Sequence, residues 1–291
     1  MNLSLKFNLI FITVFGLGLA ATVFIANRFL QDNAREETVQ QARLMMESAG
    51  STRNYTSTEI RPILERYQRA NGVFYPETVP AFSAIKIFSY LRKTYPNYSY
   101  REATLNPTNP EDRAVDWESD IINVFRNDPT KLEFVGERDA PSGRSLFLAK
   151  PITAKQSCLE CHSTPDVAPP AMVKIYGANN GFGWKLNEVV SAQIVSVPMS
   201  VPQAVASKAL WNLMLWLAAI AVISLILLNF TLILAVIRPV SRLSTAADQI
   251  SKGNLDVPEL PVRGKDEVSV LADSFNRMHR SLKSAMKMLE D

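Results

Sequence analysis

The sequence predicts an α+β domain with an antiparallel sheet and a long N-terminal helix, carried between two transmembrane helices and followed by a C-terminal helical bundle. Two apolar segments of the 291-residue chain, residues 7–27 and 210–237, contain no charged residue. Each exceeds the roughly 20 residues that a helix needs to cross a bilayer. The segment between them, residues 31–208, is long enough to fold around its own core.

Patterns within residues 31–208 alternate between helix and strand. Amphipathic or helix-favouring stretches predict three helices, at residues 31–70, 81–94 and 116–126. Residues 132–138 and 145–152 are predicted to be two strands around a turn, and residues 189–197, which are rich in β-branched residues, predict a third. Turn-forming residues place loops at residues 106–110 and 177–183. The turn sequence Pro141-Ser142-Gly143 joins the first two strands, so we expect them to be antiparallel.

Residues 158–162, Cys-Leu-Glu-Cys-His, form a CxxCH sequence that contains both cysteines of the chain and one of its two histidines. This spacing is typical of covalent haem c attachment, in which two thiols add to the vinyl groups of one porphyrin and the histidine ligates the iron. We therefore expect one haem c per chain, attached at Cys158 and Cys161, with His162 as the proximal ligand.

Three other uses of the CxxCH sequence stay open: a structural zinc site, a redox-active pair and a plain disulfide. Zinc normally takes four nitrogen or sulfur ligands, and residues 31–208 offer no further Cys or His. A redox-active CxxC is typical of the strand-to-helix turn of a βαβ unit. Here polar residues 155–157 come before the motif and several prolines follow it. Covalent haem attachment is therefore favoured.

The same motif orients the chain in the membrane. Covalent haem attachment takes place outside the cytoplasm in bacteria, so we expect residues 31–208 in the periplasm and residues 1–6 and 238–291 in the cytoplasm. Arg238 and Arg242 agree with positive-inside placement at the plasma (inner) membrane, whereas Arg28 and Arg35 do not. The first apolar segment could instead be a cleaved signal peptide, but it exceeds the usual apolar region of about 7–15 residues, which favours an uncleaved anchor.

The group opposite His162 across the iron has no motif of its own. We favour Met46 as this second metal ligand, because Ala49 and Gly50 leave one face of the long helix nearly bare for a porphyrin to approach. Methionine more often fills gaps in a core. The alternatives outside the membrane are Met45, Met172 and Met199.

Two arginines are candidate partners for the haem propionates. A guanidinium group binds a carboxylate bidentately. Arg53 follows Met46 by about two helical turns, and Arg138 lies in a predicted strand. A surface ion pair is the commoner role of an arginine.

Residues 238–291 carry heptad spacing in two runs. The apolar positions of the two runs are Val240, Leu243, Ala247 and Ile250, then Val268, Leu271, Phe275, Met278 and Leu282. Glycines and prolines at residues 253–264 predict a connector between two helices. Because neither helix can bury its apolar seam alone, we expect a parallel four-helix bundle in a homodimer. His279 lies beside the second run, where we expect a solvated residue.

These tail residues resemble a HAMP domain over residues 238–291. The resemblance rests on Pro239, Gly253-Asn254-Leu255, Asp266-Glu267-Val268 and Phe275-Asn276-Arg277-Met278. Ser269 stands where that family often has glycine. The resemblance implies that motion of the transmembrane helices is converted into a change of packing in the cytoplasmic bundle.

Residues 31–208 resemble the Tll0287-like haem domain of cyanobacterial and other bacterial sensors. The matching segments are Arg53-Asn54-Tyr55-Thr56, Arg101-Glu102-Ala103-Thr104, residues 106–110, Gly136-Glu137-Arg138, the CxxCH sequence and residues 176–185. The resemblance implies a PAS-like fold and a bound haem. In that family the iron can carry a cysteine opposite the histidine, and this chain has no third cysteine.

Taken with the resemblances, the sequence predicts a membrane-bound haem sensor of redox state or of a small ligand such as a gas. Because nothing resembling a kinase or cyclase follows the HAMP segment, the expected output passes to a cytoplasmic partner in trans. A membrane-anchored electron-transfer cytochrome c is the alternative. A haem enzyme such as a peroxidase would need a distal acid-base residue, usually histidine, so we expect no enzymatic activity. The net charge of +3 argues against a nucleic-acid partner.

Overall fold

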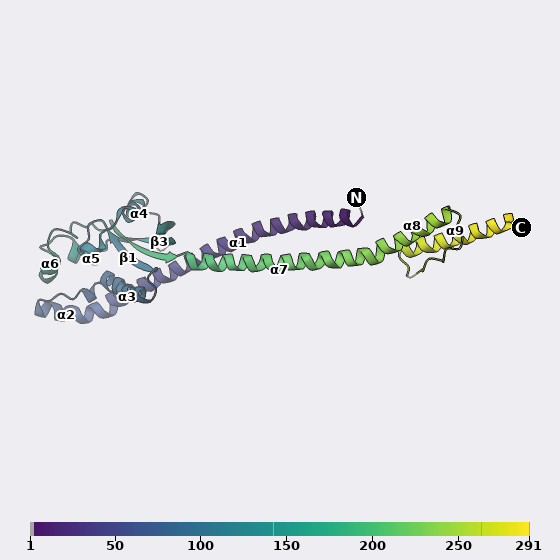
Figure 1. The fold of residues 1–291 in the computed structure, drawn as a ribbon. Coiled ribbons are helices and arrows are strands. Elements are labelled where there is room, and N and C mark those ends of the chain that lie inside the picture. Colours follow the sequence, from purple (N-terminus) through teal and green to yellow (C-terminus); the bar gives the residue numbers. More distant parts are fainter. Residues whose placement is uncertain (1–2, 142, 263, 291) are drawn as a thin grey trace. The chain divides into compact units, whose positions relative to one another are not determined.

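The computed structural model describes residues 3–141, 143–262 and 264–290. It divides into two compact units, Asn27–Ala209 and the pair Met1–Ala26 with Leu210–Asp291. The first unit contains the strands and most of the short helices, and the second contains long helices and one connector (Figure 1). The predicted α+β class is confirmed.

One long helix carries the N-terminal apolar segment onward into the first unit. Helix α1, Leu3–Tyr55, continues through a π-helical turn, Thr56–Ile60, into helix α2, Arg61–Asn71. The π turn lies just before Pro62, which has no N–H to donate and whose ring clashes with the carbonyl four residues earlier in a regular α-helix. A wider turn accommodates this clash without ending the helix. The predicted helix over residues 31–70 is confirmed.

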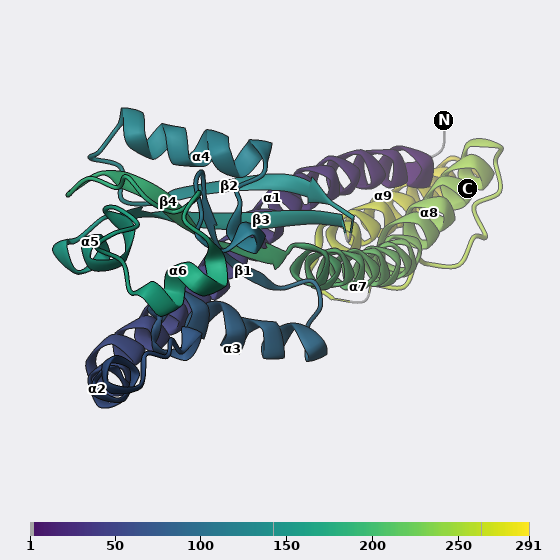
Figure 2. The ribbon, with the colours of Figure 1, turned by 90° about the vertical axis from the view of Figure 1, so that its left-hand side faces the viewer.

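The first unit is built on an antiparallel sheet of four described strands in the order β1-β4-β3-β2 (Figure 2). The strands are β1 Ser99–Thr104, β2 Phe134–Ala140, β3 Gly143–Thr153 and β4 Val189–Pro198. β2 and β3 form the predicted hairpin, in which Phe134 pairs with Ala149. β4 lies between β3 and β1 and pairs antiparallel with both.

Strand β1 has no counterpart among the predicted strands. β1 is an edge strand, and its sequence, Ser-Tyr-Arg-Glu-Ala-Thr, carries two charged residues at its centre where a strand pattern is expected to show apolar ones. Glu102 is nevertheless only 5% exposed, because Arg53 and Tyr100 bond its carboxylate. Burying a carboxylate is tolerated only with such partners. A partner that comes from a helix 49 residues away leaves no local sequence signal.

Apolar cores cover both faces of the sheet, because neighbouring residues of a strand point to opposite faces. One core lies between the sheet and helices α1 and α3, Pro80–Thr94, and includes Leu146, Leu148, Val195 and Val197. The other lies between the sheet and helix α4, Asp116–Asn127, and includes Phe147, Ala149, Ala192 and Ile194. Figure 2 shows α4 on one face and α1 with α3 on the other.

The second unit contains the remaining long helices. These are helix α7, Ser200–Leu232, which begins in the first unit, a π-helical turn, Ile233–Ile237, helix α8, Arg238–Ser251, and helix α9, Glu267–Glu290. This second π turn also lies just before a proline, Pro239. Among the described residues, the helical stretches Ser4–Asn71 and Ser200–Ser251 are long and apolar enough to cross a membrane. They contain the two predicted spans.

Buried polar side chains hold the connector between α8 and α9 against α9. The Asn276 side chain donates to the Leu260 carbonyl at 2.8 Å and accepts from the Leu260 N–H at 2.9 Å. His279 Nε2 donates to the Leu255 carbonyl at 3.0 Å. His279 is 5% exposed, so the prediction of a solvated residue is wrong. The connector folds over the imidazole, which heptad spacing alone does not reveal.

Much of the predicted apolar seam stays exposed within one chain. Packing of α8 on α9 buries Ala246, Ile250 and Ala272. Val240, Leu271, Met278 and Leu282 remain 43%, 50%, 54% and 40% exposed. Removing exposed apolar surface from water lowers the free energy of the protein. The seam is therefore available for a second chain, as the predicted homodimer requires.

The side-chain amides of Asn8 on α1 and Asn229 on α7 form two reciprocal hydrogen bonds between the apolar helices. Asn8 Nδ2 donates to Asn229 Oδ1 at 3.0 Å, and Asn229 Nδ2 donates to Asn8 Oδ1 at 2.7 Å. Interhelical hydrogen bonds in membranes contribute about 0.6 kcal/mol on average and up to about 1.7 kcal/mol. A double-mutant cycle with Asn8→Leu and Asn229→Leu is expected to give a coupling energy in this range, measured from the free energy of unfolding in detergent micelles.

Thr231→Val is the matched control for this cycle. The Thr231 hydroxyl bonds the Leu227 and Leu228 carbonyls of its own helix, so its coupling to Asn8→Leu should be near zero. Equal coupling energies for the Asn229 and Thr231 variants would contradict the interhelical role.

Candidate functional site

A cleft of about 1580 Å³ opens in the first unit. One stripe of the long helix lines it, formed by Gly50, Arg53, Asn54, Ser57 and Arg61. Spacings of three and four residues place these residues on one face of a helix. A Cβ built on Gly50 would meet no atom within 4 Å, so the helix leaves open space at this point. The CxxCH residues Cys158, Cys161 and His162 line the same cleft.

The CxxCH sequence forms helix α5, Gln156–His162, which follows the end of β3. Cys158 and Cys161 are free, half-buried thiols separated by about one helical turn. Burial raises the pKa of the Cys161 thiol, an effect that the nearby Arg61 guanidinium opposes. The sheet beside α5 is antiparallel throughout the described residues, so the motif does not lie in a βαβ unit of the kind that carries redox-active pairs.

His162 is held in one orientation by groups from two distant loops. Its Nδ1–H donates to the Gly181 carbonyl at 2.7 Å, and the Thr108 hydroxyl lies 3.3 Å from the same nitrogen. The Trp184 ring stacks on the imidazole, with centroids 4.0 Å apart and planes at 10°. Burial lowers the pKa of His162, which the bond to Gly181 opposes. Because a carbonyl only accepts, the proton lies on Nδ1, and Nε2 keeps a free lone pair for a metal.

The glycine-rich loop closes around the end of α5 through its backbone. Gly181 and Gly183 both have φ of +83°, a conformation that glycine adopts without strain. The Gly183 N–H donates to the Ser163 carbonyl at 2.8 Å, and the Trp184 N–H donates to the His162 carbonyl at 3.2 Å. The loop therefore sets the position of His162 relative to the cleft.

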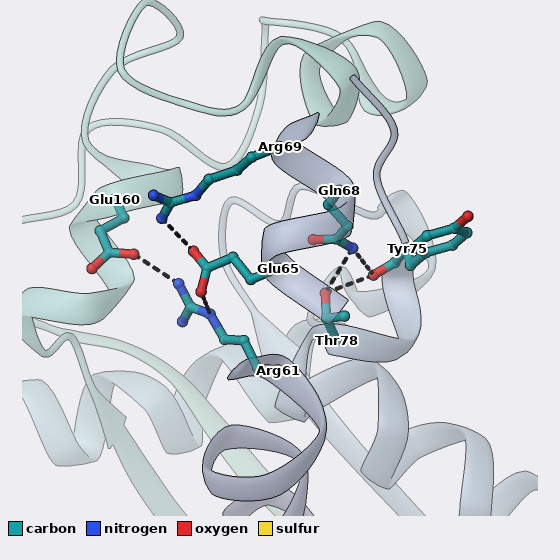
Figure 3. A network of polar contacts seen from close by, with 7 residues as sticks. All are labelled: Arg61, Glu65, Gln68, Arg69, Tyr75, Thr78 and Glu160. Atoms are coloured by element: carbon teal, nitrogen blue, oxygen red, sulfur yellow. Dashed lines mark hydrogen bonds and ion pairs between the residues drawn. The ribbon is translucent and has the colours of Figure 1, made fainter. Parts of the chain in front are cut away.

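Ion pairs connect α2 to the CxxCH helix (Figure 3). Arg61 donates to Glu160, within the motif, at 2.7 Å and lies 3.7 Å from Glu65. Arg69 pairs with the other oxygen of Glu65 at 2.5 Å. In the same view, Gln68 Nε2 donates to the Tyr75 carbonyl at 3.3 Å. These pairs are partly exposed and contribute little to stability, but they tie the long helix to α5 beside the cleft.

The two candidate arginines occupy different places. Arg53 lines the cleft, and its guanidinium is paired with the buried Glu102 carboxylate. Burial alone would lower the pKa of Arg53, but Glu102, together with Tyr100 and Cys158, raises it above its usual value. Arg138 on β2 lies 4.2 Å from the centroid of the Trp117 ring and is not among the residues that line the cleft. Propionate binding by either arginine stays a prediction.

The methionines named from the sequence also lie in different parts of the fold. Met46 is 2% exposed and packs in the core between α1, α3 and the sheet, with Met199 in the same cluster and Met45 at its edge. None of these three lines the cleft, whereas Met172 on helix α6, Pro170–Tyr176, does. Ligation by Met46 stays a prediction, and its burial in the core argues against it.

Several residues that shape the site were not predicted as site residues: Glu102, Thr108, Gly181, Trp184 and Gln193. Thr108 and Gly181 contact His162 across 54 and 19 residues of sequence. The one signal that marked them was the resemblance of residues 106–110 and 176–185 to a known family. Local spacing carried no indication that these loops meet at His162.

The donor set fits a planar, metal-containing cofactor better than a bare metal ion. Among residues 3–141, 143–262 and 264–290, no group of three or more His, Cys, Asp or Glu side chains is arranged to hold a metal ion. Two free thiols and one oriented imidazole on a single short helix, beside an open cleft, are the groups that could hold such a cofactor.

Two family models and one solved structure are similar to parts of this chain. Residues 31–198 match the Tll0287-like family model, and residues 231–284 match the HAMP domain model. The crystal structure of the cyanobacterial heme protein Tll0287 is similar, with a TM-score of 0.43 and 15% sequence identity over 56% of this chain and 95% of that chain. A search of curated proteins gave no match. Because the first match spans more than half of the 291 residues, the chain belongs to the Tll0287-like family.

Proposed function

We propose that this chain is a membrane-bound sensor that holds one haem c in its cleft. The observation that carries the proposal is His162, whose Nδ1–H is fixed by the Gly181 carbonyl while Nε2 stays free, on the same helix as the thiols of Cys158 and Cys161. Thioether bonds to the two cysteines and a bond from the imidazole to iron are the attachment that these donors support. A haem held there would supply one-electron redox chemistry and a coordination position at iron.

We assign the parts of the chain to the membrane as follows. Residues 7–27 and 210–237 span the bacterial plasma membrane, residues 31–208 form the periplasmic haem domain, and residues 1–6 and the HAMP segment 238–291 lie in the cytoplasm. The support is that haem is attached to c-type proteins outside the cytoplasm and that arginines follow the second span.

The chain connects the cleft to both apolar helices by short covalent routes. Gly50 and Arg53 line the cleft on α1, which continues without interruption from the first apolar segment. Gln193 lines it on β4, which ends two residues before α7 begins. A displacement at the cleft therefore has a direct path to each span. For such signalling, a change at the cleft must favour one packing state of the cytoplasmic helices over the other. The coupling free energy is typically about 1–3 kcal/mol.

The output of the proposed sensor is a change of packing in a HAMP homodimer that a cytoplasmic partner reads in trans. Single cysteines at Leu271 and Met278, which are half exposed on the apolar seam, are expected to crosslink between two chains. The crosslinking rate should differ between the oxidised and reduced holoprotein in membranes. Asp273→Cys is the control, because a position two residues from Leu271 faces away from the seam.

The outcomes of this experiment separate the proposed functions. Crosslinking at equal rates in both redox states, and with or without carbon monoxide, would favour the membrane-anchored electron-transfer cytochrome. Crosslinking no faster at Leu271 and Met278 than at Asp273 would contradict a dimer formed through this seam.

A further inference from the structure

A buried ion pair lines the cleft and connects three elements of the fold. Glu102 on β1 uses both carboxylate oxygens: Oε2 accepts from the Arg53 guanidinium on α1, and Oε1 accepts from the Tyr100 hydroxyl at 2.7 Å. The Tyr100 hydroxyl oxygen in turn accepts from Gln193 Nε2 on β4 at 2.7 Å. A continuous set of four side chains therefore runs from α1 through β1 to β4.

Stability alone does not account for this arrangement. A buried ion pair recovers the cost of desolvation only with good geometry, and replacing such a pair by apolar residues is often neutral or stabilising. The side chain of Glu102 is 6% exposed, whereas that of Arg53 is 27% exposed. The carboxylate is therefore the more enclosed of the two groups, and the guanidinium is the more accessible.

The position of the pair makes it sensitive to charge in the cleft. Arg53, Glu102 and Gln193 all line the cavity that holds the CxxCH residues. The Glu102 carboxylate is buried, and a charge interacts more strongly with a buried group than with one in bulk water. An electron added to the cleft repels the Glu102 carboxylate and attracts the Arg53 guanidinium, so it weakens their mutual pairing.

We propose that Glu102 is a positioning residue that sets the reduction potential of the cofactor in the cleft and, through Arg53 and through Tyr100 with Gln193, passes the change of charge to α1 and β4. This inference rests on the proposed haem function and states how a change of charge in the cleft reaches the neighbouring elements. It uses the two elements that continue toward the apolar helices, so the same four side chains tune the site and connect it to the rest of the chain.

The test is a potentiometric titration of the holoprotein at pH 8. This pH lies above the pKa of about 6 to which burial and Glu102 raise Asp112, a further cleft carboxyl. Glu102→Gln is expected to shift the equilibrium toward the reduced form at least threefold, and Arg53→Gln to shift it toward the oxidised form. A tenfold shift corresponds to 59 mV for one electron. A general loss of structure would not shift the reduction potential in opposite directions for these two paired side chains.

Glu118→Gln is the matched control for this titration. Glu118 is also a buried carboxylate, with an arginine partner, Arg101, at 3.4 Å, but it does not line the cleft. Its replacement is expected to change the equilibrium less than twofold. If Glu102→Gln fails to take up haem, Tyr100→Phe decides instead, because the Glu102 carboxylate then loses a hydrogen bond that partly offsets its negative charge, which favours the oxidised form.

Amide hydrogen exchange supplies the second readout. In the wild-type holoprotein, exchange in α1 near Arg53 and in β4 near Gln193 should differ between the oxidised and reduced forms, and Glu102→Gln should remove this difference. Haem-loaded variants with unchanged potentials would overturn this inference and leave the proposed function standing. A wild-type chain that binds no haem would overturn both.

Discussion

Replacing both Cys158 and Cys161 by alanine is expected to leave a chain without covalently bound haem, whereas the wild-type chain keeps its haem in a denaturing gel. Thioether bonds survive denaturation, and the bond from His162 to iron does not. Staining the gel for haem peroxidase activity measures the difference. Each single variant should retain one thioether, which leaves one vinyl group unsaturated and shifts the pyridine haemochrome spectrum to longer wavelength than that of the wild type.

Ser157→Ala, in the same helix α5, is the control and should stain like the wild type. His162→Ala should keep the thioether attachment and change the visible spectrum. A wild-type chain that lacks the stained band, although made in cells that mature c-type cytochromes, would rule out covalent attachment. A stained band in the double variant would place the attachment elsewhere.

Gly181→Ala is expected to have the second largest effect, because the new methyl group has no space. A Cβ at Gly181 would lie 2.0 Å from the Thr108 hydroxyl and 2.8 Å from the Thr108 backbone. The hydroxyl can rotate, but the backbone must shift. Such a shift moves the carbonyl that holds His162 Nδ1. We therefore expect a loss of unfolding free energy well above about 2 kcal/mol, with an altered haem spectrum.

Gly183→Ala is the matched control for this substitution. Gly183 has the same φ of +83°, but a Cβ there would meet no atom within 4 Å. Its cost should therefore be limited to the strain of a left-handed residue, about 1–2 kcal/mol. Urea unfolding of both variants isolates the clash with Thr108, and equal costs would show that the clash is relieved without moving the loop.

Sequence patterns predicted those elements whose stability is local. The hairpin of β2 with β3 and the helix over residues 81–94 follow from turn chemistry and periodicity in short windows, although Ser142 of the predicted turn lies outside the described residues. Strand β1 was missed because its buried Glu102 depends on Arg53, which lies in another element. The sequence predicts a solvated His279 because heptad spacing describes how helices meet and carries no information about a connector that folds over them.

The candidate site divides in the same way. Cys158, Cys161 and His162 form a contiguous motif, so their association needs no tertiary contact. The sequence favours Met46 because its helix has a bare neighbouring face, but the side chain at that position packs into the core. The bare face itself, at Gly50, does line the cleft. Which residue of a stripe faces a cavity depends on the packing of other elements, which one helix does not encode.

The two π turns have a consequence for helical phase. A π turn holds one more residue than the α turn it replaces, and each residue of an α-helix advances the chain by about 100°. The sequence positions that share one helix face therefore shift by one residue across Ile233–Ile237. The heptad positions of the seam that begins at Val240 cannot be extended into α7 at seven-residue intervals. The same offset separates α1 from α2 across Thr56–Ile60. Deleting one residue from Ile233–Ile237 would let an ordinary α turn replace the π turn, so α8 would keep about the same orientation relative to α7 while its residues return to the α-helical count.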